Sequence, residues 1–143
     1  MEKIEFKKNI KNTLLKNNFK QFKKWFIMDC EELFIGIILT KSNFSELYYV
    51  DCGIFVKQRW NDEQYASLSP YEAEIRYRID SCPYLEVAPV DYEKTFSEKL
   101  NKFLQIVTGS GIKKLKGDIA KNPYQYFLKM PLEEAKEWSP IWK

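Results

Sequence analysis

The sequence predicts an α+β domain with an N-terminal helix, a four-stranded antiparallel sheet in meander order, and C-terminal helices packed on one face of that sheet. Three observations lead to this prediction. Apolar residues recur at helical spacing in the first segment, four strand-like runs follow it, and helical spacing returns after residue 90. A chain of 143 residues has the length of one ordinary domain, so we expect residues 1–143 to form a single unit.

The first helix is expected within residues 2–19. They are mostly good helix formers, and Phe6, Ile10 and Leu14 lie four residues apart on one face. The helix is predicted to end near Asn17 and Asn18, because asparagine favours turns.

Three strands are predicted next, over residues 22–28, 33–40 and 47–57. Each run is rich in aromatic and β-branched residues, and short polar turns at 29–32 and 41–45 separate the runs. Connections this short join antiparallel neighbours, so the strands are expected to follow one another in a meander.

A fourth strand is predicted over residues 73–80, where apolar and charged residues alternate strictly. Such a strand has one buried face and one solvent face. The alternation places one set on the buried face: Ala73, Ile75, Tyr77 and Ile79. It places the other set on the solvent face: Glu74, Arg76, Arg78 and Asp80.

After the strands, Asp91 is predicted to cap a helix that continues to Val107 and ends at the glycine-containing segment 109–111. Proline and asparagine then limit the length of each element. Three shorter helical pieces are predicted in this part of the chain: 112–120, 124–129 and 132–138.

The composition excludes several kinds of chemistry. Histidine is absent, which rules out serine–histidine and cysteine–histidine catalysis. Cys30, Cys52 and Cys82 are odd in number and show no C-x-x-C spacing, so neither a disulfide framework nor a zinc site is indicated. We therefore expect reduced, mostly buried thiols, and neither a metal nor a cofactor.

The N-terminal segment carries no targeting signal that the sequence reveals. Residues 1–24 contain eight lysines and no apolar run long enough for a signal peptide or a membrane span. We therefore expect a cytoplasmic protein without membrane contact.

Charge is distributed unevenly along the chain, although the net charge is only +3. Residues 1–24 hold eight lysines against two acids, and residues 99–143 hold nine lysines against four acids. Residues 25–98 hold six basic residues against fourteen acids. The pattern fits a basic surface for phosphates together with an acidic surface for a basic partner. We favour the simpler interpretation, in which the charges lie on solvated faces and pair within the fold.

The open face of the predicted sheet carries the candidate protein-binding residues. If helices cover the face that contains Val50, Cys52 and Ile54, the opposite face presents aromatic, arginine and acidic side chains. Aromatic and arginine side chains dominate the energetics of many interfaces, but cross-strand ion pairs explain such a face as well. The candidates are Tyr49, Asp51, Phe55, Glu74, Arg76 and Arg78.

Two other functions remain open. A nucleic-acid-binding protein would use the lysine-rich first helix and the segment after it, with Phe22 and Trp25 available for stacking. Its candidate residues are Lys7, Lys8, Lys11, Lys20, Lys23 and Lys24. A small-molecule enzyme would use Tyr49, Asp51 and Arg76 or Arg78 on the open sheet face, and it requires a pocket there.

Three segments, 14–20, 50–55 and 74–79, together resemble a bacterial family known as domain of unknown function 4304. The resemblance covers roughly residues 5–80 and implies a compact α+β fold, while the family supplies no established activity or site. The chain departs from the family pattern at three places: Asn18 stands where the family has glycine, Asp51 where it has asparagine, and Ala73 and Glu74 where it has cysteine and histidine. Gly53, Arg76 and Arg78 match the pattern.

The function we predict from the sequence is a small, non-enzymatic protein-interaction module. A specific form of this hypothesis is an immunity protein that binds and neutralises a bacterial toxin domain, because such proteins are small, cytosolic and free of cofactors. Nucleic acid binding and small-molecule catalysis are kept as alternatives.

Overall fold

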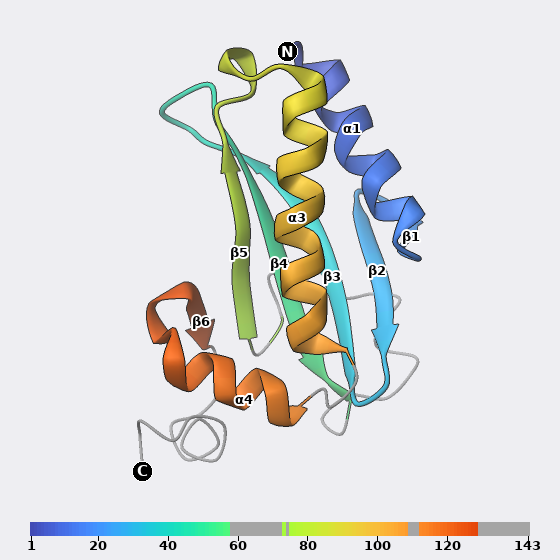
Figure 1. Ribbon diagram of the computed structural model, residues 1–143, viewed down its shortest axis with the longest axis vertical. Helices are drawn as coiled ribbons and strands as arrows, with labels where there is room; N and C mark the ends of the chain where they lie inside the picture. The colour runs from blue at the N-terminus through green and yellow to red at the C-terminus, as the bar shows by residue number, and fades with distance from the viewer. Residues whose placement is uncertain (58–72, 74, 109–111, 129–143) are drawn as a thin grey trace.

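The structure of the protein is a computed structural model that describes residues 1–57, 73, 75–108 and 112–128 (Figure 1). The helices are α1 (Lys3–Lys16), α3 (Pro89–Val107) and α4 (Ile112–Lys121), with the 3-10 helices η3 (Tyr84–Glu86) and η4 (Pro123–Gln125). The strands are β1 (Lys20–Phe22), β2 (Trp25–Cys30), β3 (Leu33–Lys41), β4 (Tyr48–Val56), β5 (Ile75–Cys82) and β6 (Tyr126–Leu128).

The predicted α+β class with an antiparallel sheet is confirmed, but the sheet differs from the prediction in its number of strands. It has six strands in the order β1-β2-β3-β4-β5-β6, and every neighbouring pair is antiparallel. The C-terminal helices are followed by β6, so the described part of the chain does not close on helices as predicted.

The first additional strand arises because the predicted strand 22–28 is a hairpin. Phe22 of β1 pairs with Trp25 of β2, which leaves Lys23 and Lys24 as a two-residue turn. Lys23 has a φ of 56°, a left-handed backbone that glycine or asparagine usually provides in such turns. Lysines are not typical of such turns, so the sequence did not predict the hairpin.

The second additional strand, β6, replaces the helix predicted over 124–129. Tyr126, Phe127 and Leu128 pair with the first three residues of β5. Three residues are too few to show a period of two in a sequence, and only the edge of β5 makes them a strand. The predicted helix over 132–138 lies outside the described residues.

The α3 helix also begins earlier than predicted. Its first residue is Pro89 and its N-cap is Ala88, so Asp91 lies in the first turn instead of capping the helix. Proline is favourable at this position because its missing N–H would be unpaired there in any case.

The helices α1 and α3 lie across one face of the sheet (Figure 1). Phe6 and Ile10 of α1 and Phe96 and Leu100 of α3 are fully buried against this face. Leu115 and Ile119 of α4 join the same core. The predicted core face of β4 is confirmed, because all its members belong to this core: Tyr48, Val50, Cys52, Ile54 and Val56.

The three cysteines are free and buried, as predicted. Burial raises the pKa of Cys30 and of Cys82 to about 11, and it raises the pKa of Cys52 well above its ordinary value. The thiols therefore serve as small apolar groups of the core.

Three buried or partly buried tyrosines anchor the helices and loops through carboxylates. Tyr84 donates a hydrogen bond to Glu46, Tyr92 donates to Asp80 over 2.9 Å, and Tyr126 donates to Asp118 over 2.5 Å. The bond to Glu46 raises the pKa of Tyr84 to about 12. Burial, together with the neighbouring carboxylate, raises the pKa of Tyr92 and of Tyr126 far above the ordinary value.

These tyrosines make folding sensitive to alkaline pH. Each has a higher pKa in the folded state than the value of about 10 that an unfolded chain shows, so the folded state holds the proton more tightly. Their contribution to stability is complete below about pH 10 and falls as the pH rises toward the folded pKa. A tyrosinate absorbance titration is expected to show fewer of the nine tyrosines ionised at about pH 11 in the folded protein than in urea. Ionisation of all nine near pH 10 in the folded protein would contradict these assignments.

Candidate functional site

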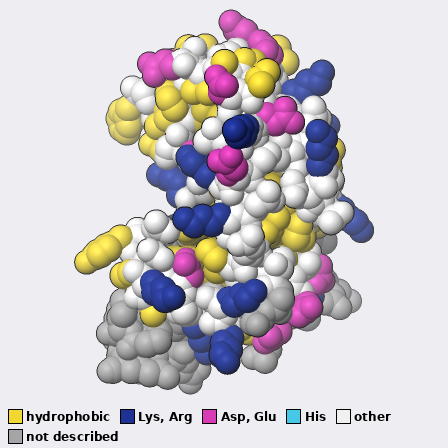
Figure 2. Space-filling model, in the orientation of Figure 1, with side chains coloured by type: hydrophobic (Ala, Val, Ile, Leu, Met, Phe, Trp, Pro, Cys, Tyr) yellow, Lys and Arg dark blue, Asp and Glu magenta, His cyan; other side chains and the backbone are white. Residues whose placement is uncertain are grey.

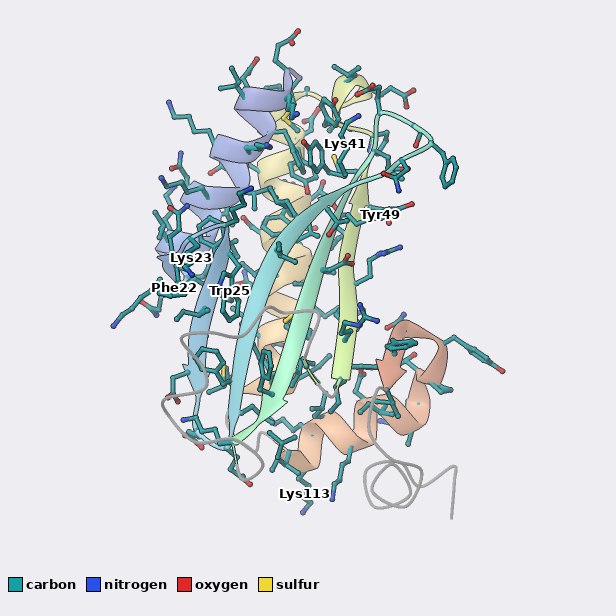
Figure 3. The ribbon with its side chains drawn as sticks, turned by 180° about the vertical axis from the view of Figure 1, so that it is seen from behind. Phe22, Lys23, Trp25, Lys41, Tyr49 and Lys113 are labelled. Atoms are coloured by element: carbon teal, nitrogen blue, oxygen red, sulfur yellow. The ribbon has the colours of Figure 1, made fainter. Side chains whose placement is uncertain are left out.

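The candidate site lies on the sheet face opposite α1 and α3, where β4, β5 and β6 meet. Figure 3 views the molecule from the side opposite to that of Figure 1, so this face is toward the reader, and Tyr49 is labelled on it. Across the strands, Arg78 is the partner of Asp51 and Arg76 is the partner of Gly53. Asp51, Gly53, Arg76 and Arg78 therefore lie on the sheet face to which the alternation of the sequence assigned them.

Arg78 is held by two neighbours on β4. Its Nε donates a hydrogen bond of 2.8 Å to Oδ1 of Asp51, and its guanidinium carbon lies 3.7 Å from the centroid of the Tyr49 ring. About half of the Arg78 side chain, 51 %, is exposed. The ion pair and the cation–π contact thus fix the orientation of an arginine that solvent still reaches.

Arg76 stacks in the same way on a ring from β6. Its guanidinium carbon lies 4.5 Å from the centroid of Phe127, a side chain that is 55 % exposed. The strand pairing explains the contact, since Arg76 and Phe127 are direct cross-strand partners.

A hollow of about 730 Å³ lies between these side chains. It is lined on one side by Asp51, Arg76 and Arg78 and on the other by η4 and β6, where Tyr124 is fully exposed. The name arginine–aromatic site is used below for this group: Tyr49, Asp51, Arg76, Arg78, Tyr124 and Phe127.

Asp80 does not lie on this face, contrary to the predicted alternation. Val50 pairs with Asp80 and Asp51 pairs with Arg78, so Ile79 is an extra residue in β5. Such a bulge reverses the face of every later side chain. Asp80 is therefore 7 % exposed on the helix side, where it accepts hydrogen bonds from Lys99 and Tyr92.

Another candidate protein-binding residue, Phe55, does not contribute an exposed group. Phe55 is 0 % exposed and packs against Phe34 at 6.0 Å between ring centroids. Both belong to a second buried cluster with Trp25 and Ala73 on this side of the sheet. Phe55 is thus a packing residue, and Glu74 lies outside the described residues.

The sequence analysis missed Tyr124 and Phe127. Both were assigned to a helix, and they reach the site only because η4 and β6 bring them to the edge of β5. The one available signal was the break at Pro123, after which helical spacing is not continued.

The six candidate nucleic-acid-binding lysines are all exposed, but they do not share one surface of α1. Lys7 and Lys11 lie four residues apart in one row, and Lys8 is turned by about 100° from Lys7. Lys23 and Lys24 form the β1–β2 turn, and Lys20 is the first residue of β1. Figure 3 labels Lys23 in this turn. Of the two aromatic residues suggested for stacking, Trp25 is only 5 % exposed, and Phe22 is partly buried against the second cluster.

Neither metal binding nor membrane insertion finds support in the described residues. Among residues 1–57, 73, 75–108 and 112–128, no group of three or more potential metal-ligating side chains is close enough to hold an ion. No helix in the same part of the chain combines the length and the apolar character needed to cross a membrane.

Comparison with known proteins adds no relatives. No protein-family model, no curated protein and no solved structure matches this chain. The resemblance to domain of unknown function 4304 thus stays a prediction.

Proposed function

We propose that this chain is a protein-binding module that contacts its partner through the arginine–aromatic site. The observation that supports the proposal is the pair of arginines, Arg76 and Arg78, each laid on an aromatic ring on the sheet face opposite the helices. Arginine and aromatic side chains are enriched at protein interfaces and supply much of the binding energy.

The contacts around Arg78 favour tight recognition. Asp51 and Tyr49 already fix the guanidinium, so a partner that binds it has less side-chain freedom to remove. Beside it, Tyr124 and Phe127 offer apolar surface that water now covers. The site combines charge recognition with apolar contact, as interface centres do.

Small-molecule catalysis is less well supported by the same geometry. Asp51 is the one carboxylate among the described residues that line the hollow, and it is bonded to Arg78. A general acid–base mechanism needs a carboxyl group free to exchange its proton with a substrate.

The specific form that we propose is an immunity protein, whose partner is a toxin domain. The absence of histidine from the sequence, which rules out histidine-dependent catalysis, fits this non-enzymatic form. The arginine–aromatic site would then cover an acidic and apolar surface of the toxin.

Affinity capture with matched variants tests the proposal. The tagged chain is incubated with lysate of its source, with and without nuclease, beside the variant Arg76→Ala/Tyr124→Ala/Phe127→Ala. Arg78 is kept, because its removal would leave Asp51 without its cation. The control Phe44→Ala/Leu85→Ala/Lys94→Ala removes one exposed aromatic, one exposed apolar and one exposed cationic side chain elsewhere.

The expected result is a stoichiometric protein that resists nuclease, is kept by the control and is lost with the site variant. Urea unfolding checks that both variants stay folded. A partner that the site variant retains would contradict the proposal. Recovery of nucleic acid alone, with an affinity that falls steeply with salt, would favour the lysines of α1 and the β1–β2 turn.

A further inference from the structure

The outer edge of β5 is only partly covered by β6. The pairing with β6 takes up Ile75, Arg76 and Tyr77, whereas β5 continues to Cys82. For residues 79–82, the described part of the chain supplies a strand partner on the β4 side alone. Figure 1 shows no described helix or strand beside this edge between β6 and the β3–β4 turn. Backbone N–H and C=O groups on such an edge can pair with another strand.

Two hollows meet at this edge. The hollow of the arginine–aromatic site lies on one side of the sheet, and a second hollow of about 240 Å³ lies on the helix side. Tyr77, Ile79 and Gln125 line both of them. Figure 2 shows the surface indented at this margin of the molecule, above α4 and β6. An added strand would therefore find room for side chains on both faces.

Both hollows carry cations. Arg76 and Arg78 line the first hollow, and Lys99 and Lys102 line the second. The side chain of Lys99 is 47 % exposed, close to the value for Arg78. Basic side chains thus lie on both sides of the part of the β5 edge that no described strand pairs with.

Asp51 and Asp118, the carboxylates among the described residues that line the hollows, are engaged within the fold, and so is Asp80 beside Lys99. Asp51 is bonded to Arg78, Asp80 to Lys99 and Tyr92, and Asp118 to Tyr126 and Asn122. Among the described residues that line the two hollows, four are cationic and two, Asp51 and Asp118, are carboxylates. The lining of the hollows therefore favours an anionic ligand.

We propose, building on the proposed function, that the partner enters as a short extended segment with consecutive acidic residues, which adds a strand to residues 79–82 of β5. Successive side chains of a strand point to opposite faces. Neighbouring carboxylates of the segment then meet the arginines on one face and the lysines on the other. Main-chain pairing supplies affinity and the side chains supply selectivity.

The same features argue against a second copy of this chain at the edge. A second copy would bring its own two basic-lined hollows to this edge, and two surfaces of the same charge repel each other. The bulge at Ile79 leaves a short regular stretch from Asp80 to Cys82, so the edge suits a short strand better than a long flat one.

Peptide titration of the full chain, followed by amide NMR and hydrogen exchange, tests the inference. The probe is the peptide Thr-Glu-Glu-Val-Glu-Glu-Thr. A second peptide replaces each glutamate with lysine. Two more peptides keep the glutamates and carry backbone N-methyl groups, one at the odd-numbered and the other at the even-numbered residues. In an added strand, alternate N–H groups face β5, so only one of these two peptides loses the N–H groups that pair with β5.

The acidic peptide is expected to shift the amide signals of residues 79–82 and slow their exchange, and the lysine peptide is not. One of the two N-methylated peptides is expected to bind about tenfold more weakly than the unmethylated acidic peptide, because it loses about two backbone hydrogen bonds to β5. The other N-methylated peptide should bind as the unmethylated one does. The variant Lys102→Glu should weaken binding of the acidic peptide severalfold, and the matched control Lys113→Glu on α4 should not.

Equal binding by both N-methylated peptides would overturn strand addition, and so would unchanged signals at residues 79–82 with millimolar acidic peptide. Binding of the lysine peptide would overturn the acidic partner. The capture experiment separates the two proposals. In one outcome, the captured partner is lost with the Arg76→Ala/Tyr124→Ala/Phe127→Ala variant and yet leaves the amides of residues 79–82 unprotected from exchange. That result would support binding at the arginine–aromatic site and contradict strand addition at β5.

Discussion

Replacing Phe55 with alanine is expected to lower the free energy of unfolding by about 3–5 kcal/mol. The side chain is 0 % exposed and packs against Phe34 in the second cluster. Its truncation removes apolar area from the core and leaves a cavity that the neighbouring strands cannot close without shifting. Urea unfolding, followed by the change in circular dichroism, measures the loss.

The variant Phe127→Ala is the matched control for this prediction. Phe127 is the same residue type, but it is 55 % exposed, so its truncation should cost about 1 kcal/mol or less. If the two variants were equally stable, Phe55 would not be a core residue, and its assignment to the protein-binding surface would have to be restored.

Replacing Asp80 with alanine is expected to cost about 3 kcal/mol. Its carboxylate accepts a bond of 2.6 Å from Lys99 and one of 2.9 Å from Tyr92, both on α3. Removal leaves the buried Tyr92 hydroxyl without this acceptor, whereas Lys99 is half-exposed and can turn to water. The loss is therefore smaller than for a fully buried ion pair.

Two further variants show whether the bonds to α3 cause the effect. Asp80→Asn keeps an acceptor for Tyr92 and should fall between the wild type and Asp80→Ala in urea unfolding. Glu98→Ala removes an exposed carboxylate from α3 and should be nearly neutral. A cost for Asp80→Ala as small as that for Glu98→Ala would contradict the role of Asp80 as the link between β5 and α3.

Hydrophobic periodicity predicted the parts of the fold that repeat over many residues. The nine residues of β4 alternate between the core and the opposite face, and the core residues of α1 recur every four residues. In both cases burial of one face decides the structure, so the sequence pattern contains the information.

The parts that the sequence did not predict depend on single residues or on pairing with another strand. One extra residue in β5, Ile79, moves Asp80 to the other face of the sheet. The sequence alternates strictly through this position, so the sequence pattern does not reveal the bulge. The Lys23–Lys24 turn lacks the usual turn residues, and β6 is a strand only because β5 is next to it.

The candidate site shows the same division. Tyr49, Asp51, Arg76 and Arg78 were predicted together because they belong to two long neighbouring strands. Phe127 was not predicted with them. It belongs to a three-residue strand and follows its cross-strand partner, Arg76, by 51 residues. A contact across that distance leaves no periodic signal in the sequence.

Hydrogen exchange of the captured complex, measured by mass spectrometry against the free chain, tests the central claim most directly. Binding at the arginine–aromatic site predicts slower exchange in the segments 49–51, 76–78 and 124–127, with α1 and the β1–β2 turn unchanged. Protection confined to α1 and the β1–β2 turn would contradict the account and place the partner on the lysine-rich surface.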